Sequence, residues 1–260
     1  MRRQPGRRIV PGIILIAGMG LLTLVGGGRA ADTPAQVLPD EDYPKMLKYA
    51  AKGIQDALKG SPKEEQITKA RTAAIMVAAY AQQNLTGADG GQRAAVRDAA
   101  LQIVETIEAR KYTDAAKKAG ELAALPADPK AKKEAIKLID SRVKFKDLMN
   151  QFNHPPDGGW GIHREFYQYQ LGMKGIPATE LREPLLLKAY QVAVTADLIG
   201  MKTPTKNQKE WAAYAGDMKA GALELADAVR AKDGKAGVSA VAKVTTSCTS
   251  CHKIFGGGPK

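Results

Sequence analysis

Apolar residues recur every three or four positions along most of the chain, the spacing of an amphipathic α-helix. The first clear run, residues 42–58, includes Met46, Ala50 and Ile54 at this spacing. Few stretches alternate apolar and polar residues as a half-buried strand would, so the pattern predicts an all-α fold. Further runs predict a second helix that ends near residue 85 and helices over residues 92–109, 113–124, 129–152, 180–200, 206–232 and 234–255.

One segment interrupts this pattern. Residues 154–163 read HPPDGGWGIH, and Pro and Gly at this density are incompatible with a regular element. We therefore expect a long connection from residue 154 to residue 177, with helices resuming near residue 180. Composition agrees with the helical prediction, because Ala, Leu, Lys and Glu are abundant and aromatic residues make up only 5% of the chain.

The first thirty residues differ from the remainder. Four arginines precede an apolar stretch over residues 9–25, and small residues follow up to Ala30. This is the three-part pattern of a secretory signal peptide, with cleavage expected after Ala30. An uncleaved membrane anchor is the alternative, since the stretch approaches the length of a span, but Pro11 and repeated glycines disfavour a spanning helix. We expect residues 1–30 to be removed and the protein to be periplasmic.

Removing the five arginines of the signal peptide lowers the formal net charge from +12 to +7. A moderately basic surface can guide docking onto an acidic partner. The lysines lie along the predicted helices without interleaved aromatic residues, which gives no support for nucleic-acid binding.

Two parts of the chain resemble each other. KARTAAIMVAAYAQQ, from Lys69, parallels KAYQVAVTADLIGMK, from Lys188, and the following helices match at a shift that is three residues longer. We interpret this as an internal duplication that yields two four-helix-bundle units in tandem. The expected domains are two helical bundles, residues 31–126 and residues 127–260.

The haem prediction comes from the two cysteines. Cys248, Cys251 and His252 form the sequence Cys-x-x-Cys-His, the signature of covalent haem attachment. Two thiols at this spacing add across the two vinyl groups of haem, and the adjacent histidine binds the iron. On a helix, positions i, i+3 and i+4 share one face, so the three side chains can reach one haem.

Redox, zinc and disulfide chemistry fit this cysteine pair less well. A thioredoxin-like redox pair would follow a strand-to-helix unit, and none is predicted here. A structural zinc site would need a second cluster of Cys or His residues, and the sequence has no such cluster. A disulfide remains possible in an exported protein, although a bridge over so short a loop stabilises little.

The stretch GVSAVAKVTTSCTSCHKIF, residues 237–255, resembles the last helix of the class II cytochromes c, the family of cytochrome c′. Proteins of that family are exported four-helix bundles with the haem motif close to the C-terminus. The resemblance covers residues 130–255 and implies one covalent haem c, held by Cys248 and Cys251 with His252 as the proximal iron ligand. The first half lacks the motif, so the haem is expected only in the second unit.

The same resemblance suggests a ligand on the other side of the iron. Low-spin members of the family carry a Leu-Met pair on their first helix, and Leu148-Met149 occupies a comparable place here. Met149 is therefore the candidate distal ligand, although methionine at helical spacing often only fills a core. His154 or His163 could replace it. Trp160 could cover a haem edge or anchor its loop on the bundle.

Function follows from the coordination of the iron. With Met149 bound, the expected role is electron transfer in the periplasm, with a redox partner that has an acidic docking face. With Met149 only packed, the iron would be five-coordinate and could bind a small gas such as nitric oxide. A third possibility gives the haem-free half a docking role. No catalytic constellation accompanies the motif, so we expect no enzymatic activity, and we expect a monomer.

Overall fold

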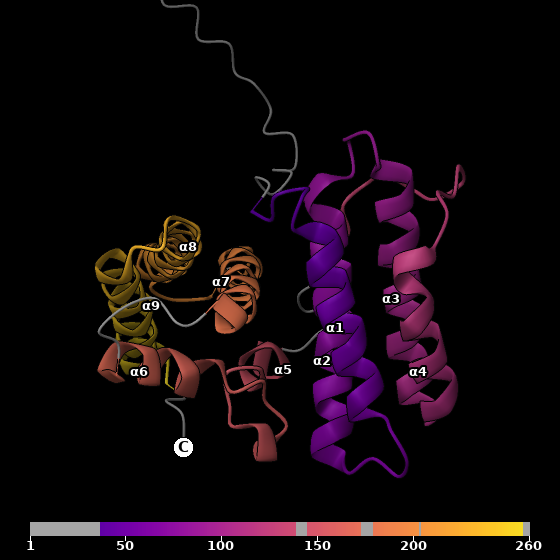
Figure 1. Ribbon diagram of the computed structural model, residues 1–260, viewed down its shortest axis with the longest axis horizontal. Coiled ribbons are helices and arrows are strands. Elements are labelled where there is room, and N and C mark those ends of the chain that lie inside the picture. Colours follow the sequence, from indigo (N-terminus) through magenta and orange to yellow (C-terminus); the bar gives the residue numbers. More distant parts are fainter. Residues whose placement is uncertain (1–36, 139–144, 173–178, 203, 257–260) are drawn as a thin grey trace, which may run out of the picture. The chain divides into compact units, whose positions relative to one another are not determined.

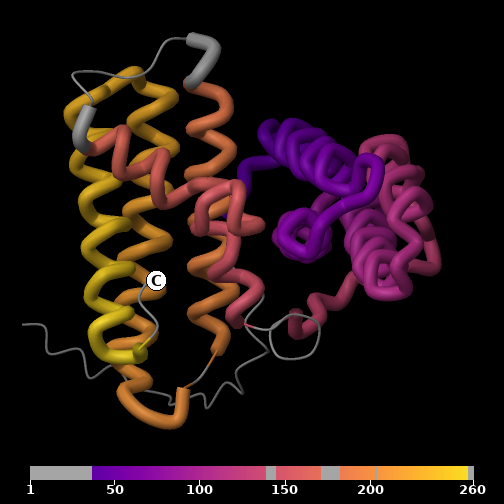
Figure 2. The backbone as a smooth tube through the Cα atoms, turned by 90° about the horizontal axis from the view of Figure 1, so that it is seen from below, coloured from indigo at the N-terminus to yellow at the C-terminus, as the bar shows by residue number. Residues whose placement is uncertain are grey.

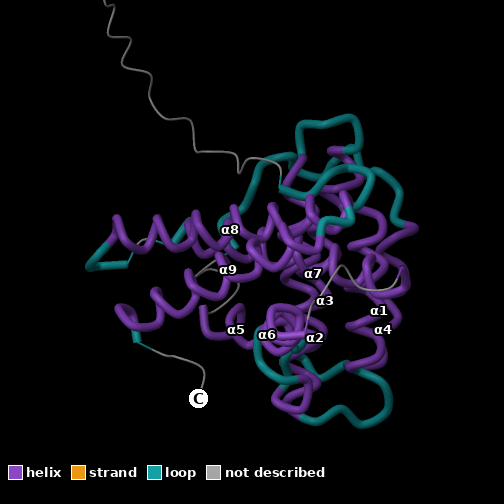
Figure 3. Tube along the Cα trace, turned by 60° about the vertical axis from the view of Figure 1, so that its left-hand side comes forward, coloured by secondary structure: helices purple, strands orange, loops and turns teal. Residues whose placement is uncertain are grey.

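The computed structural model describes residues 37–138, 145–172, 179–202 and 204–256. Within these ranges every regular element is a helix and none is a strand, so the predicted all-α fold class is confirmed (Figure 3). The predicted signal peptide, residues 1–30, lies outside the described residues. None of the described helices is both long and apolar enough to cross a membrane.

The first group of helices comes from the first half of the chain and runs side by side in Figure 1. α1 and α3 each pack against both α2 and α4. The apolar face predicted for the first helix is buried, as the near-zero exposure of Met46 and Ile54 shows. The four helices are α1 (Tyr43–Ala57), α2 (Glu64–Ala81), α3 (Gly90–Glu108) and α4 (Tyr112–Glu121).

The second group contains the helix with the cysteines. α8 packs along α7 and along α9, and α6 packs on α9 (Figure 2). Gly221 allows α8 and α9 to approach closely, because a Cβ atom there would lie 3.0 Å from Cγ2 of Val244 and 3.1 Å from the carbonyl oxygen of Ala240. The helices are α6 (Ile162–Gly172), α7 (Thr179–Gly200), α8 (Gln208–Ala231) and α9 (Gly234–Phe255).

The predicted long helix over residues 129–152 is wrong. Residues 129–138 form turns, bends and irregular backbone, and residues 139–144 lie outside the described residues. Of the predicted helix, only the short α5 (Phe145–Asn150) is present among the described residues, followed by a turn. The helical pattern of residues 129–138 is therefore not followed by the backbone, and Met149 lies on the described helix α5.

The backbone of this segment bonds to side chains of the first group. The guanidinium group of Arg97 donates hydrogen bonds to the carbonyl oxygens of Lys132 and Glu134, at 2.9 and 2.6 Å. The side-chain oxygen of Gln82 accepts one from the amide of Ile136, at 3.4 Å. In a helix those carbonyls would serve amides four residues further on. Arg97 is only 2% exposed, and leaving its donors unpaired would cost several kcal/mol, so this tertiary arrangement overrides the local helical pattern.

The expected long connection is also only partly correct. A short 3-10 helix, Pro155–Asp157, and its turn occupy the start of the segment, but α6 then begins at Ile162. Ile162, Phe166 and Tyr169 of α6 are buried at helical spacing. The remaining part of the connection, residues 173–178, lies outside the described residues.

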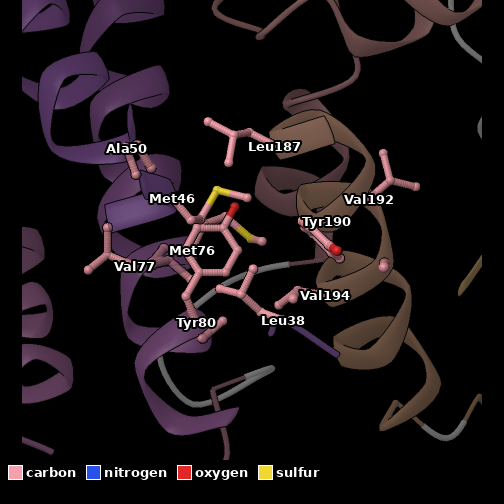
Figure 4. Packing of buried hydrophobic residues seen from close by; sticks show 14 of the residues in the cluster. Leu38, Met46, Ala50, Met76, Val77, Tyr80, Leu187, Tyr190, Val192 and Val194 are labelled. Carbon is pink, nitrogen blue, oxygen red and sulfur yellow. The ribbon is translucent and has the colours of Figure 1, made fainter. Parts of the chain in front are cut away.

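The described helices belong to one compact unit, residues 33–260, and their buried apolar side chains form one cluster. In Figure 4, Met46 of α1 and Met76 of α2 point toward Leu187 and Tyr190 of α7. The hydroxyl group of Thr195 on α7 also lies 3.8 Å from the sulfur atom of Met76. The two groups of helices therefore share apolar contacts between α2 and α7.

Candidate functional site

Both cysteines lie in the last turns of α9. Cys248 and Cys251 are half-buried free thiols, and His252 follows them on the same helix. Asp233 caps the beginning of α9, where its carboxylate accepts a hydrogen bond from the amide of Ala236 at 3.0 Å. Because α9 is regular through Phe255, the two thiols and the imidazole keep the i, i+3, i+4 arrangement that the sequence predicts.

A cavity of about 310 Å³ opens beside this face of α9. This volume lies at the lower end of the range for small-molecule and cofactor sites, roughly 300–1,000 Å³. The cavity brings together Met149 with Cys248, Cys251 and His252, the four residues predicted from the sequence. Its other lining residues are mainly apolar: Phe145, Ile199, Lys202, Pro204, Trp211, Tyr214, Ala215, Met218, Ser247, Phe255 and Gly256.

Trp211 of α8 forms a wall of the cavity between two phenylalanines. Its ring centroid lies 5.4 Å from that of Phe145 on α5 and 4.9 Å from that of Phe255 on α9, the latter edge-to-face. The indole N–H of Trp211 donates a hydrogen bond to the carbonyl oxygen of Ile199, at 2.9 Å. The bond fixes the ring at the end of α7, so the aromatic cluster formed by α5, α8 and α9 is also held against α7.

A second methionine lies in the cavity. Met218 of α8 is buried, and its sulfur atom is 4.0 Å from the sulfur atom of Cys248. Met149 is less buried and comes from α5, a different element. The two thioethers therefore approach the cavity from separate helices.

Burial changes the protonation of the motif. Burial raises the pKa of Cys248 to about 11, with a smaller contribution from Cys251, and it also raises the pKa of Cys251. Burial lowers the pKa of His252, and its electrostatic interaction with His163 lowers it further. At neutral pH the thiols are therefore protonated and the neutral imidazole is favoured, the form of histidine that binds metal ions.

The two alternative histidines do not line the cavity. His154 pairs with Arg164, whose guanidinium nitrogen lies 2.7 Å from its Nε2 atom. His163 stacks on Tyr167, with ring centroids 6.5 Å apart. Of the three candidates for the distal ligand, Met149 alone lines the cavity.

Trp160 packs on the first group of helices. Its indole ring lies where a Cβ atom on Gly53 of α1 would be, and its ring centroid is 5.4 Å from that of Tyr49. The ammonium group of Lys69 lies 4.8 Å from the Trp160 ring centroid. Of the two roles considered for Trp160, the structure supports that of an anchor for its loop.

The sequence pattern does not identify Trp211, Met218 or Lys202 as part of the site. Trp211 and Met218 lie seven residues apart on α8, a spacing that predicts one buried face but not what that face contacts. Within the described ranges, no group of three or more Cys, His, Asp or Glu side chains is placed to hold a metal ion.

Comparisons of the chain with protein-family models, with curated protein sequences and with solved structures find no match. The function of the site must therefore be inferred from its own residues and geometry.

Proposed function

We propose that the chain is an exported mono-haem c-type cytochrome that carries electrons. The observation on which this proposal rests is the apolar cavity that contains Cys248, Cys251, His252 and Met149 together. Two thiols three residues apart, followed at once by a histidine, match the donor set that attaches haem covalently.

The remaining residues of the cavity suit a flat aromatic cofactor. Trp211 and Phe255 offer aromatic surfaces, and Met218 packs beside Cys248. Lys202 brings a cation to the cavity, which could pair with a haem propionate. An apolar environment also keeps water away from the iron, a factor that tunes its reduction potential.

Each predicted ligand then has a defined role. Cys248 and Cys251 would hold the haem through thioether bonds, His252 would be the proximal ligand, and Met149 the distal ligand. The haem iron supplies the one-electron exchange, and ligation by methionine and histidine is typical of electron carriers with a raised potential. The protein's own part is to exclude water and to hold the two axial side chains in place.

We also propose the tandem arrangement of two four-helix bundles, α1–α4 and α6–α9. Its support is that the two groups share three helix contacts. The first helix packs on the fourth in each group (α1 on α4, α6 on α9), and the third helix packs on both the second and the fourth (α3 on α2 and α4, α8 on α7 and α9). In addition, α6 begins at Ile162, which lies 119 residues after the first residue of α1, Tyr43, the same shift as in the matched sequence of the second helices. Together with the motif, this arrangement favours a relationship to the class II cytochromes c, with haem only in the second bundle. It departs from that family in one respect, because Met149 lies on α5, before the first helix of the second bundle, and not on that helix.

The periplasm and an acidic redox partner belong to the same proposal. The basic and apolar N-terminal stretch supports export, and the predicted excess of seven positive charges after cleavage supports docking to an acidic surface.

Expression of the full chain with the c-type cytochrome maturation machinery tests this proposal. We expect a haem that stays with the polypeptide under denaturing conditions, one per chain, and that is lost in the Cys248→Ser/Cys251→Ser variant. Absence of covalent haem from the unmodified chain would refute the proposal.

Carbon monoxide distinguishes electron transfer from gas binding. Reduced protein with Met149 on the iron should resist carbon monoxide, and Met149→Ala should bind it rapidly and lose the low-spin spectrum. Rapid stoichiometric binding by the unmodified protein would instead favour a five-coordinate gas-binding protein.

A further inference from the structure

The position of Met149 beside the cavity depends on the tertiary contacts of α5. Six residues of this helix are described, Phe145–Asn150, and isolated helices shorter than roughly 12–15 residues are marginal in water. These contacts lie on both sides of α5.

On one side, α5 is bound by α2 of the first group. The guanidinium group of Arg71 donates a hydrogen bond to the carboxylate of Asp147. The hydroxyl group of Thr72, the next residue of α2, donates one to the backbone carbonyl of Asp147 at 3.2 Å. Arg71 also lies 3.7 Å from Glu108 of α3. Its side chain is 28% exposed and that of Asp147 12%, so the pair is partly shielded from water.

On the other side, α5 is bound by α7. The amide nitrogen of Gln151 donates hydrogen bonds to the carbonyl of Leu148 and to the hydroxyl of Thr195, each at 2.8 Å. The side-chain oxygen of Gln151 accepts one from Gln191 at 2.9 Å. These three polar side chains and Leu148 are buried, so their bonds fix the end of α5 against α7.

Helical geometry connects these contacts to the site. Residues two positions apart on an α-helix point about 200° apart around the axis. Asp147 faces Arg71, and Met149 accordingly faces the cavity. A contact made by the first group of helices thereby helps to set where the thioether lies.

We propose that Arg71 is a positioning residue for the haem, which through Asp147 holds α5 so that Met149 can bind the iron. The inference rests on the proposed function. It gives the first bundle a role in setting iron coordination. Loss of the ion pair loosens α5, raises the fraction of iron without its thioether, and opens the distal side to external ligands.

Charge reversal in the full-length haem-loaded protein tests this role. Arg71→Asp should weaken the far-red charge-transfer absorption of methionine-ligated ferric haem. The same variant should speed carbon monoxide association with the reduced protein roughly tenfold, as expected for loss of a charge-assisted hydrogen bond. The double variant Arg71→Asp/Asp147→Arg should return the rate to within roughly threefold of the unmodified protein. Arg71→Gln, which introduces no negative charge, should show a smaller change in the same direction.

A second ion pair provides the matched control. Lys219 of α8 pairs with Asp197 of α7, and their side chains are 25% and 12% exposed, close to the values for Arg71 and Asp147. Lys219→Asp therefore reverses the charge in a pair of similar burial without touching α5. It should leave the absorption band and the carbon monoxide rate unchanged.

Amide hydrogen exchange supplies a measurement without haem. In the Cys248→Ser/Cys251→Ser background, Arg71→Asp should speed exchange in residues 145–152 and leave α8 and α9 unaffected. A lower melting temperature with unchanged exchange in this segment and an unchanged carbon monoxide rate would show that Arg71 is only structural, and would overturn the inference.

The outcomes separate the inference from the proposed function. Absence of covalent haem would overturn the proposed function and, with it, the role of Arg71. An unchanged spectrum in Met149→Ala would remove Met149 as the ligand while leaving the haem attachment intact, and it too would overturn the inference. A changed spectrum in Met149→Ala with none of the expected changes in the Arg71 variants would overturn the inference alone.

Discussion

At the scale of single residues, the two methionines of the cavity have different roles in the proposed haem-bound state. Haem c is joined to its cysteines through carbon atoms at the edge of the ring. The sulfur atom of Met218 is 4.0 Å from that of Cys248, so Met218 would pack at this edge rather than bind the iron. Met149 enters the cavity from α5, an element separate from the helix that carries the thiols, which leaves it the better candidate for the distal ligand.

A single lysine outside the cavity makes stability depend on pH. Burial lowers the pKa of Lys188 to about 8, and the positive charge of Lys69 lowers it further, although Lys188 donates a hydrogen bond to Glu165. The unfolded chain therefore binds a proton here more tightly than the folded chain. The resulting destabilisation, at most roughly 3 kcal/mol, is complete below pH 8 and disappears as the pH rises toward the unfolded value of 10.5.

Lys188→Met tests this coupling, because methionine keeps much of the apolar stem and has no charge. The variant should be more stable than the unmodified protein at pH 7, and its advantage should shrink steadily between pH 8 and pH 10. Urea denaturation of both proteins at several pH values measures the difference. Lys52→Met, which removes an exposed partner of Asp56 on α1, is the control and should show no such trend. A pH-independent difference for Lys188→Met would contradict the shifted pKa.

At the scale of elements, the sequence predicts most long helices but not those that depend on distant partners. The apolar periodicity over 42–58, 92–109 and 206–232 matches α1, α3 and α8 because each buries one continuous stripe. Residues 129–138 have a similar periodicity, yet buried Arg97 takes their carbonyl groups and no helix forms.

The site was predictable to a similar extent. The motif on α9 is local in sequence, so Cys248, Cys251 and His252 could be named as a group before the fold was known. Met149 was suggested by resemblance and lies in the same cavity. Trp211 could not be assigned to the site, because its neighbours Phe145 and Phe255 reach it only through tertiary packing.

Two glycines on α8 offer a test of how closely the helices pack. A Cβ atom on Gly216 would have no atom within 4 Å, whereas one on Gly221 would press against Val244 and the backbone of α9. Gly216→Ala should raise the free energy of unfolding by about 0.5–1 kcal/mol, because alanine favours the helix. Gly221→Ala should lower it by about 1–3 kcal/mol through overpacking.

Thermal unfolding of the haem-free Cys248→Ser/Cys251→Ser protein measures both effects without interference from haem. Opposite signs are the expected result, since the two positions share a helix and differ in their neighbours. Equal stabilisation by both alanines would mean that α8 and α9 can move apart without loss of stability, contrary to the close approach at Gly221.

At the scale of the whole molecule, the apolar contacts of α2 with α7 join the two groups of helices. The sulfur atom of Met76 lies 3.8 Å from the hydroxyl group of Thr195, and these two residues are separated by 119 positions, the shift of the internal repeat. Equivalent positions of the proposed duplicates thus meet at this contact. Because the buried apolar side chains of both groups form one cluster, we expect the chain to unfold as a single cooperative unit.

Met76→Ala is the test of this cooperativity. Met76 is 1% exposed, and its truncation should lower the free energy of unfolding by about 2–5 kcal/mol. In a haem-free Trp160→Phe background, Trp211 is the sole tryptophan and reports on the second group, while far-ultraviolet circular dichroism reports on all helices. Both signals should share one urea midpoint, and Met76→Ala, although it lies on α2, should shift both equally. The expectation would be contradicted by two separate transitions in which Met76→Ala leaves the Trp211 midpoint unchanged. The duplicated halves would then fold independently, and the contact between α2 and α7 would contribute little to the free energy of unfolding.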